Sequence, residues 1–444
     1  MRLFGTDGVR GRANTELTPE LALKLGRSAV AVLAEGGHQP LICIGRDTRV
    51  SGEMLFFAFA AGAMSAGADV VDCGVLPTPA LAFMTKHRQA TVGVMISASH
   101  NPAIDNGIKL FSRHGYKLPD EVEDRIEAHT KSTGSAPTVE GDKVGKMIMG
   151  GQEDNAYLDY LLGLAKLDLR GVKIVVDAAH GAAYTIAPRL FRLLGAEVLP
   201  LCVSPNGVNI NVGCGSTYPE AMRQTVLATG AALGLAFDGD ADRLIACDSQ
   251  GNILDGDNFL HICGLALKDE QGLTNNLVVG TVMSNLGLDA SLGREDIVLK
   301  RALVGDRYVL QEMWQSGAVL GGEQSGHCLF LNHSTTGDGL LTALMLLKAT
   351  YGRGIALDAF AAELKRYPQV LYNVPVKNKQ ASMEHVAVKE AIVGAESLVE
   401  GRGRVLVRPS GTESLVRVMV EAETEELANA AARVVVQVLS TVSA

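Results

Sequence analysis

Three aspartates stand at alternate positions of one short segment, residues 237–243 (FDGDADR), directly after an apolar run at 233–236. Alternate residues of an extended segment point to one side, so Asp238, Asp240 and Asp242 could present three carboxylates together. Such carboxylates repel one another unless a hard cation neutralises them. An EF-hand is excluded, because its sixth position would be Gly and its twelfth Glu, whereas this chain has Arg243 and Ser249. We therefore expect a Mg²⁺ site that water and a phosphate complete.

A serine loop follows a second strand-like run, residues 91–96 (TVGVMI). Asn101-Pro102 favours a turn, and Pro102 restricts Asn101 to extended geometry. Ser99 is therefore expected on a turn at the carboxyl end of a strand, where α/β sheets expose functional groups. The segment alone is also typical of a capped turn. A serine hydrolase is not favoured, because the chain contains no Gly-x-Ser-x-Gly.

A glycine-rich loop, residues 321–327 (GGEQSGH), carries three polar side chains. Glu323 and Ser325 suit the recognition of hydroxyl groups, and His327 could carry a proton near neutral pH. Taken alone, the loop is ambiguous.

A second donor-rich segment lies near the end of the chain, at residues 408–412 (RPSGT). Ser410, Gly411 and Thr412 can offer backbone N–H groups and hydroxyls, and Arg408 adds a fork of donors suited to phosphate oxygens, with Arg417 beyond. This density of donors favours anion binding over an ordinary turn. Further cations lie in two other loops, at Arg46, Arg49 and Lys109.

Three segments of similar plan must position these loops. Each begins with an apolar strand-like run (40–44, 172–176 and 277–280), passes through a polar loop into a helix, and returns to an apolar run (67–71, 195–198 and 296–299). β-branched runs that alternate with helices predict βαβ units and largely parallel sheets. The three occurrences suggest a triplicated α/β unit.

The last part of the chain differs from the rest. We expect a polar loop over residues 367–383, a helix over 386–398, strands over 404–408 and 414–421, and a closing helix over 424–439. This order predicts a small α+β domain. The expected domains are residues 1–151, 152–253, 254–367 and 368–444, since 444 residues exceed one ordinary core.

Composition excludes several classes of protein. Hydrophobic residues make up 47% and charged residues 20%, as in globular and not disordered chains. A net charge of −9 argues against nucleic acid and anionic membranes as partners. The beginning of the chain lacks the apolar core of a signal peptide, and the longest uncharged apolar stretch, residues 54–68, is too short to span a bilayer. The seven cysteines are scattered, so we expect reduced thiols in a cytoplasmic protein.

With these four loops in this order, the chain resembles the α-phosphohexomutase family over essentially its full length, from residues 5–11 (GTDGVRG) to 408–412. The resemblance implies three similar α/β domains with mixed, largely parallel sheets, plus a smaller α+β C-terminal domain, around a central cleft. It also implies one Mg²⁺ per active site and no membrane or nucleic-acid partner. A homodimer is expected from the family alone.

The resemblance also implies roles for individual residues. Ser99 would be the phosphoserine that shuttles the phosphoryl group, and Ser97, two residues earlier, is the serine most easily mistaken for it. Asp238, Asp240 and Asp242 would hold Mg²⁺ together with the Ser99 phosphate. Charge stabilisation and proton transfer would fall to Arg46, Lys109 and His327, while Arg243 would support the phosphate. Contacts to the sugar hydroxyls would come from Glu323 and Ser325. The clamp for the non-reacting phosphate would consist of Arg408, Ser410, Gly411, Thr412 and Arg417.

The implied reaction converts glucosamine 6-phosphate into glucosamine 1-phosphate, a step toward UDP-N-acetylglucosamine and peptidoglycan precursors. Glucosamine or glucose 1,6-bisphosphate would serve as intermediate or activator. Within the family, the same reaction on mannose or glucose phosphates is the alternative, because the sugars differ at a single position. An aspartyl-phosphate phosphatase with Asp238 as nucleophile is the rival from another class, although Asp242 stands where that class would want Thr or Val. A non-catalytic sugar-phosphate sensor is the third hypothesis.

Overall fold

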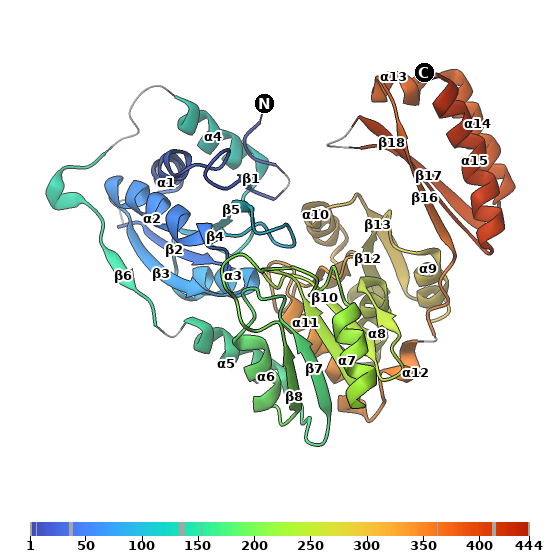
Figure 1. Cartoon of the computed structure of the whole chain (residues 1–444), viewed down its shortest axis with the longest axis horizontal. Coiled ribbons are helices and arrows are strands. Elements are labelled where there is room, and N and C mark those ends of the chain that lie inside the picture. The colour runs from blue at the N-terminus through green and yellow to red at the C-terminus, as the bar shows by residue number, and fades with distance from the viewer. Residues whose placement is uncertain are drawn as a thin grey trace. The chain divides into compact units, whose positions relative to one another are not determined.

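The computed structural model describes residues 2–5, 7–34, 39–132, 138–151, 153–361, 363–410 and 414–442. Its elements fall into two compact units, Met1–Met283 with Glu295–Glu363, and Ser284–Arg294 with Leu364–Ala444. The first unit holds three sheets, and the second holds one (Figure 1). No described helix is long and apolar enough to cross a bilayer.

The first sheet has six strands in the order β1-β5-β4-β2-β3-β6. Its central strands β2, β3 and β4 are parallel, and β5 runs antiparallel to β1 and β4. The strands are β1 Val9–Arg12, β2 Leu41–Arg46, β3 Asp69–Val75, β4 Val92–Ile96, β5 Asp105–Ser112 and β6 Met147–Met149, and the helices are α1 Pro19–Leu33, α2 Ser51–Ser65, α3 Thr78–His87 and α4 Asp120–Lys131.

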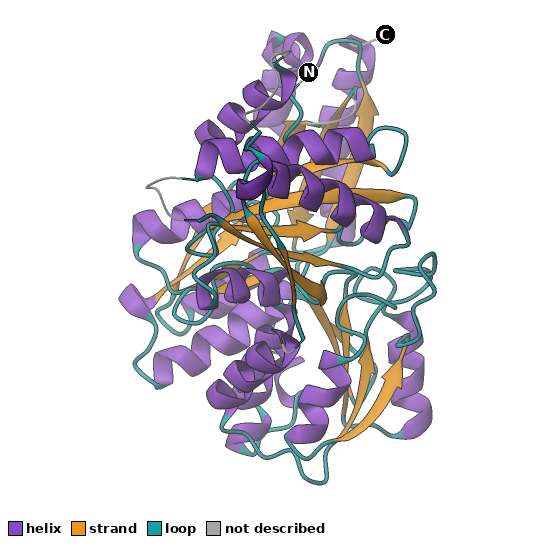
Figure 2. Cartoon of the chain, turned by 90° about the vertical axis from the view of Figure 1, so that its left-hand side faces the viewer, coloured by secondary structure: helices purple, strands orange, loops and turns teal. Residues whose placement is uncertain are grey.

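Helices α1 and α2 approach one another closely enough to require glycine. A Cβ on Gly26 would lie 2.2 Å from the carbonyl oxygen of Phe59, and one on Gly62 would lie 2.0 Å from that of Leu23. Apolar side chains of the two helices belong to the same core as those of the first sheet. Helices lie on either side of the strands of the first unit (Figure 2). The apolar run at 54–68 is therefore largely a core helix, as expected.

The second and third sheets have the orders β11-β10-β9-β7-β8 and β13-β12-β14-β15. The elements are α5 Glu153–Ala165, β7 Lys173–Asp177, α6 Ile186–Leu193, β8 Glu197–Leu201, α7 Glu220–Thr229, β9 Leu233–Phe237, β10 Leu244–Asp248, β11 Ile253–Leu254, α8 Gly256–Asp269, β12 Leu277–Thr281, β13 Val298–Ala302, α10 Asp306–Ser316, β14 Leu320–Gly322, β15 Cys328–Phe330, α11 Gly339–Ala349 and α12 Asp358–Ala361. Three short 3₁₀ helices complete the described elements of the first unit, at Gly141–Lys143, Thr274–Asn276 and Tyr351–Arg353.

The three expected βαβ segments are confirmed. The pairs β2/β3, β7/β8 and β12/β13 are each parallel, and each pair is joined by a helix, α2, α6 or α9 (Leu286–Gly293). Helix α9 groups with the second unit. Antiparallel strands extend each sheet on one side, so the sheets are mixed, as predicted.

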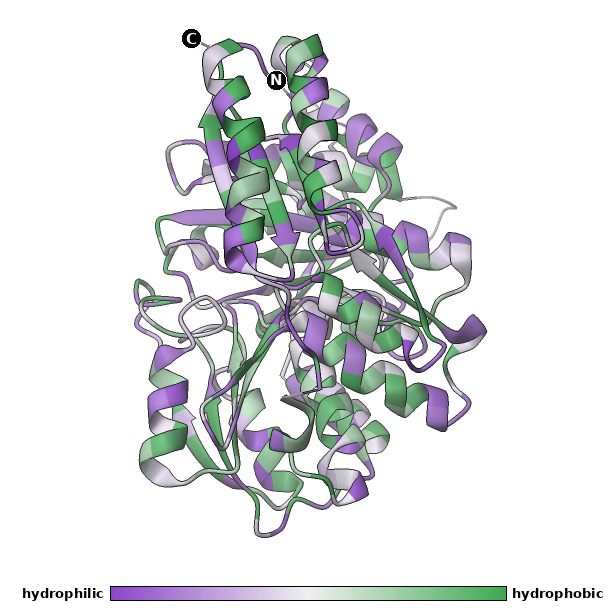
Figure 3. Ribbon diagram, turned by 90° about the vertical axis from the view of Figure 1, so that its right-hand side faces the viewer, coloured by the Kyte–Doolittle hydropathy of each residue, from purple (hydrophilic) through white to green (hydrophobic). Residues whose placement is uncertain are grey.

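The second unit contains an antiparallel sheet of order β16-β18-β17. Its strands are β16 Gln369–Pro375, β17 Gly403–Pro409 and β18 Leu415–Ala422, and its helices are α13 Lys379–Glu384, α14 Val386–Leu398 and α15 Glu425–Val442. Helices α14 and α15 lie side by side, and α15 carries both hydrophobic and hydrophilic residues along its length (Figure 3). The hydrophobic side chains of this unit, including Val374, Val418 and Val435, form one core.

The predicted polar loop over residues 367–383 is wrong. This stretch forms β16 and α13, and β16 pairs with β18 over its whole length. β16 is an edge strand that leaves most of its side chains partly or fully exposed, so polar residues such as Asn373 are compatible with it. Composition therefore concealed the strand.

Candidate active site

The three aspartates converge in a turn between β9 and β10. One oxygen from each of Asp238, Asp240 and Asp242 lies within 4.8 Å of the others, and all three residues are buried. The expected extended geometry is wrong, because Ala241 has φ 56° and its N–H donates to the carbonyl oxygen of Asp238 at 3.1 Å. The tight turn, and not strand alternation, gathers the carboxylates.

These carboxylates fit a hard cation. Asp238 accepts hydrogen bonds from the Ser99 hydroxyl at 2.6 Å and from the Arg243 N–H at 3.2 Å. The Oδ1 atoms of Asp240 and Asp242, however, are buried and accept no hydrogen bond from the described residues. Burial, followed by the charges of Asp242 and Asp240, raises the pKa of Asp238 well above its usual value. A divalent cation would satisfy the orphaned oxygens and offset this repulsion, and oxygen ligands are those that Mg²⁺ prefers.

Ser99 faces this cluster from the end of β4. It is 2% exposed and has φ 51°, and its hydroxyl is the one that reaches Asp238. Ser97 has a different role, because its hydroxyl donates to Asp47 at 2.6 Å and accepts the Ser99 N–H at 2.9 Å. The structure therefore distinguishes the two serines: Ser97 shapes the turn, and Ser99 meets the aspartates.

Arg49, which the sequence indicated only as a further cation, holds the serine loop. Arg49 donates to the carbonyl oxygens of Ser99 and Asn101, both at 2.9 Å, while its Nε pairs with Asp47 at 2.8 Å. Arg46 instead pairs with Asp72 at 2.7 Å, and its guanidinium lies 4.9 Å from the ring centroid of Phe56. Arg49 therefore supports the backbone of the serine turn, and charge stabilisation by Arg46 stays a prediction.

Lys109 connects the aspartates to a set of alternating charges that we term the charge ring. Its Nζ lies 2.8 Å from Asp240 and 3.2 Å from Asp7. Lys117 then joins Asp7 to Asp306, the latter at 2.6 Å, and His327 lies 3.6 Å from both Asp306 and Asp242. In order, the members are Asp240, Lys109, Asp7, Lys117, Asp306, His327 and Asp242. The ring combines groups from β5, the β9–β10 turn and the third domain, all within the first unit.

Each member of the charge ring stabilises the charge of its neighbours. Burial lowers the pKa of Lys109, but the charges of Asp240, Asp7 and Asp242 outweigh it and raise that pKa above its usual value. Burial raises the pKa of Asp7, but Lys109, Lys117 and Arg10 hold it well below its usual range. For His327, burial again opposes the charge, yet Asp242 raises the pKa to about 8.

Sequence reasoning missed Asp7, Arg10, Lys117 and Asp306. Arg10 pairs with Asp7, and its charge helps burial and Arg243 to lower the pKa of His100 to about 4. The only available signal was the segment 5–11 at the start of the chain, which contains Asp7 and Arg10. Lys117 and Asp306 belong to no motif.

The loop at 321–327 packs against the aspartate turn. A Cβ on Gly326, which has φ 90°, would lie 1.9 Å from the carbonyl oxygen of Leu244, so only glycine permits this approach. The loop thereby brings His327 to Asp242. Burial lowers the pKa of Arg243, but the charges of Asp242, Asp238 and Glu323 outweigh it and raise that pKa above its usual value. Ser325 is exposed.

The second unit has its own cationic cluster. Arg408 and Arg417 are directly paired in register on β17 and β18, and burial together with the charge of Arg417 lowers the pKa of Arg408. Ser410 is buried, and its carbonyl oxygen accepts a hydrogen bond from Lys379 at 2.6 Å. Gly411 and Thr412 lie outside the described residues. Like charges at paired strand positions repel unless an anion lies between them, and Lys379 adds a cation that the sequence did not single out.

Comparison with known proteins supplies the family. Models of phosphoglucomutase/phosphomannomutase domains I, II, III and C-terminal match residues 1–136, 155–251, 255–367 and 371–438. A phosphoglucosamine mutase of Desulforudis audaxviator is 53% identical over 426 residues, 96% of this chain and 95% of that protein. The chain belongs to the phosphoglucomutase/phosphomannomutase family. Another phosphoglucosamine mutase, of Thermoanaerobacter sp. (strain X514), is 52% identical over 95% of this chain and 94% of its own.

Solved structures of this family share the fold. A phosphoglucomutase/phosphomannomutase family protein of Burkholderia thailandensis superposes with a TM-score of 0.81 at 24% identity, covering 99% of this chain and 97% of its own. The Aspergillus fumigatus N-acetylphosphoglucosamine mutase, solved in complex with GlcNAc-6P and magnesium, has a TM-score of 0.72 at 16% identity, covering 100% and 96%. The predicted fold of three α/β domains and a C-terminal domain is confirmed.

Proposed function

We propose that this chain interconverts glucosamine 6-phosphate and glucosamine 1-phosphate, a step in the supply of UDP-N-acetylglucosamine. The observation that carries the proposal is an identity of 53% and 52% to phosphoglucosamine mutases over nearly the full length. The mannose and glucose alternatives are not favoured, because these relatives carry the glucosamine name.

Ser99 is the proposed carrier of the phosphoryl group. Phosphorylated Ser99 gives its phosphoryl group to O1 of glucosamine 6-phosphate, which forms glucosamine 1,6-bisphosphate and frees the serine hydroxyl. Ser99 then takes the phosphoryl group from O6, which releases glucosamine 1-phosphate and restores the phosphoserine. The hydroxyl at 2.6 Å from Asp238 is the geometry that supports this role, and it disfavours Asp238 as the nucleophile of a phosphatase.

Charged groups around Ser99 suit phosphoryl transfer. Mg²⁺ held by Asp238, Asp240 and Asp242 would neutralise charge on the phosphoryl oxygens. Lys109 and Arg243 keep positive charge beside the aspartates, which favours an anionic ligand at the turn. His327 is the proposed proton carrier, while Glu323 and Ser325 are the proposed contacts to sugar hydroxyls. In the second unit, Arg408, Ser410, Arg417 and the neighbouring Gly411 and Thr412 would hold the phosphate that is not reacting.

Replacement of Ser99 tests the proposal. Purified protein is expected to carry one phosphate on Ser99 by intact mass, and the phosphate should resist hydroxylamine, unlike an acyl phosphate. Ser99→Ala should abolish mutase activity while the fold persists. Full activity of Ser99→Ala without an added nucleophile would contradict the mechanism. A comparison of kcat/KM for glucosamine, mannose and glucose 6-phosphates tests the substrate, and size-exclusion chromatography tests the expected homodimer.

A further inference from the structure

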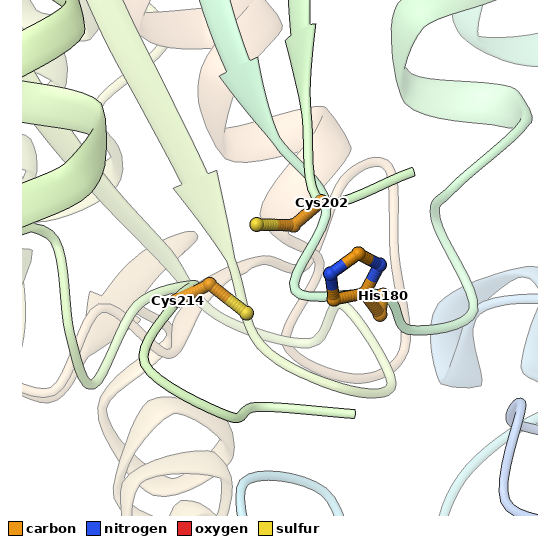
Figure 4. Close-up of side chains that lie close together, drawn as sticks. All are labelled: His180, Cys202 and Cys214. Atoms are coloured by element: carbon orange, nitrogen blue, oxygen red, sulfur yellow. The ribbon is translucent and has the colours of Figure 1, made fainter. Parts of the chain in front are cut away.

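A second group of metal-ligating side chains lies in the second domain, apart from the aspartate turn. His180 follows β7, Cys202 follows β8, and Cys214 lies on the loop that leads to α7. One ligand atom from each lies within 4.8 Å of the others, and Cys214 is buried whereas His180 and Cys202 are half-buried. Figure 4 shows the two sulfur atoms on the same side of His180, with one ring nitrogen of His180 turned to that side.

The backbone holds these side chains in place before any ligand arrives. The His180 N–H donates to the Cys202 carbonyl oxygen at 2.6 Å, and the Thr48 hydroxyl donates to the His180 carbonyl oxygen at 2.5 Å. His180 and Cys202 both have left-handed backbones, with φ 51° and 52°. Two unfavourable conformations at neighbouring strand ends aim the imidazole and one thiol at a shared point.

We propose that His180, Cys202 and Cys214 form a site for a borderline-soft divalent cation of the zinc class. Two thiolates and one imidazole are the donor set that Zn²⁺ prefers, and they leave a fourth position that water can reach past the half-buried residues. This set differs from the oxygen ligands of the aspartate turn, which favour Mg²⁺. The two sites therefore select different metals.

Binding exchanges protons for the metal. Both thiols release theirs, so two thiolates neutralise the charge of the ion. The Ser204 N–H donates to Nδ1 of His180 at 3.2 Å in the structure, and this long hydrogen bond lies on the exposed surface. Coordination through Nε2 of His180 places the ring proton on Nδ1, so the Ser204 N–H must then withdraw from it.

The proposed site would fix a segment that supports the reacting serine. The segment between Cys202 and Cys214 contains Asn211, whose side-chain amide donates to the carbonyl oxygens of Ser99 at 2.9 Å and Asn101 at 3.2 Å. A metal that holds Cys202 and Cys214 together ties both ends of this segment. We infer a structural role for the metal, which holds the segment behind the Ser99 turn.

Titration of the reduced, full-length protein with Co²⁺ in excess Mg²⁺ tests the site. Co²⁺ bound by thiolates absorbs strongly in the near ultraviolet, whereas Co²⁺ bound by carboxylates does not. The absorption should appear with one equivalent of Co²⁺, disappear on addition of Zn²⁺, and be lost in Cys202→Ser and Cys214→Ser. A matched control, Cys263→Ala in α8, should retain it.

Further measurements keep the result decisive if the serine variants fold poorly. His180→Asn leaves both thiols and should weaken Zn²⁺ binding at least about tenfold in a chelator competition. The Ser204 amide signal should shift on Zn²⁺ binding. Absence of the absorption in folded wild-type protein would overturn the proposal. So would a Cys202–Cys214 disulfide that survives reduction, or an absorption unchanged in both serine variants.

Discussion

The charge ring makes its sharpest prediction at Lys117. This side chain is 14% exposed and lies between two carboxylates, Asp306 at 2.6 Å and Asp7. Lys117→Met removes the cation and keeps most of the apolar stem. Among the described residues, Asp306 would then retain His327 at 3.6 Å, while Asp7 would retain both Lys109 at 3.2 Å and Arg10. Both carboxylates stay partly buried with less compensation of their charge.

The expected cost follows from that geometry. Removing one partner of a buried ion pair costs about 3–5 kcal/mol, because it leaves the other charge uncompensated. Since Asp306 keeps one cation and Asp7 keeps two, we expect the lower end, about 3 kcal/mol. Asp306→Asn should cost a similar amount. In the double variant both charges are absent, so the loss should fall short of the sum by roughly 2 kcal/mol.

Urea unfolding followed by Trp314 fluorescence is a suitable assay. Trp314 is the only tryptophan of the chain and lies in α10, the helix that begins at Asp306, so its signal reports on the first unit. The surface pair Arg223–Glu220 provides the control, and Arg223→Met should leave the unfolding midpoint nearly unchanged. Additivity of Lys117→Met and Asp306→Asn to within about 0.5 kcal/mol would refute the coupled ring.

Three further outcomes are expected. Ser97→Ala should leave Ser99 phosphorylated but lower the free energy of unfolding by about 1–3 kcal/mol, because the buried Ser99 N–H and Asp47 each lose a hydrogen-bond partner. Mass spectrometry measures the phosphate and urea unfolding measures the stability. Loss of the phosphate in this variant would contradict the assignment of Ser97 as a residue that only shapes the turn. Burial raises the pKa of Asp338 to about 6. Because the ionised form of this side chain is disfavoured in the folded protein, folding should become less favourable as pH rises from about 4 to 6. Asp338→Asn keeps the helix cap and a polar group facing Tyr157. The free energy of unfolding of this variant, relative to that of the natural sequence, should therefore rise by at most about 3 kcal/mol over that pH range and stay constant above it. An equal difference in unfolding free energy at pH 4 and pH 7 would exclude the effect. Removal of divalent cations with a chelator should abolish mutase activity, and Mg²⁺ should restore it; activity that persists after exhaustive chelation would argue against a catalytic cation.

Local sequence was sufficient for groups that lie on one loop. The segment 237–243 contains all three aspartates, and a tight turn of seven residues has few ways to keep them apart. Ser99 was likewise predictable, because a strand followed by Asn-Pro ends in a turn at the edge of the sheet. The parallel pairs β2/β3, β7/β8 and β12/β13 followed from apolar runs at regular intervals.

Local sequence failed where the partner decides the structure. β16 is a strand because β18 pairs with it, although its own composition is that of a loop. Arg46 ends β2 and Arg49 lies three residues later in the following loop, and nothing local tells which of them reaches the carbonyl oxygens of the serine turn.

The sequence by itself predicted the chemistry: a serine proposed to accept a phosphoryl group, oxygen ligands suited to a hard cation and donors suited to a phosphate, each carried by one short segment. Tertiary structure alone decided how these groups are charged and aligned. The charge ring joins Asp7, Lys109, Lys117, Asp242 and Asp306, with His327 and Asp240, and these residues are spread from position 7 to 327. Coulombic energy depends on distance in space and on burial, and neither is encoded within a single segment of the chain.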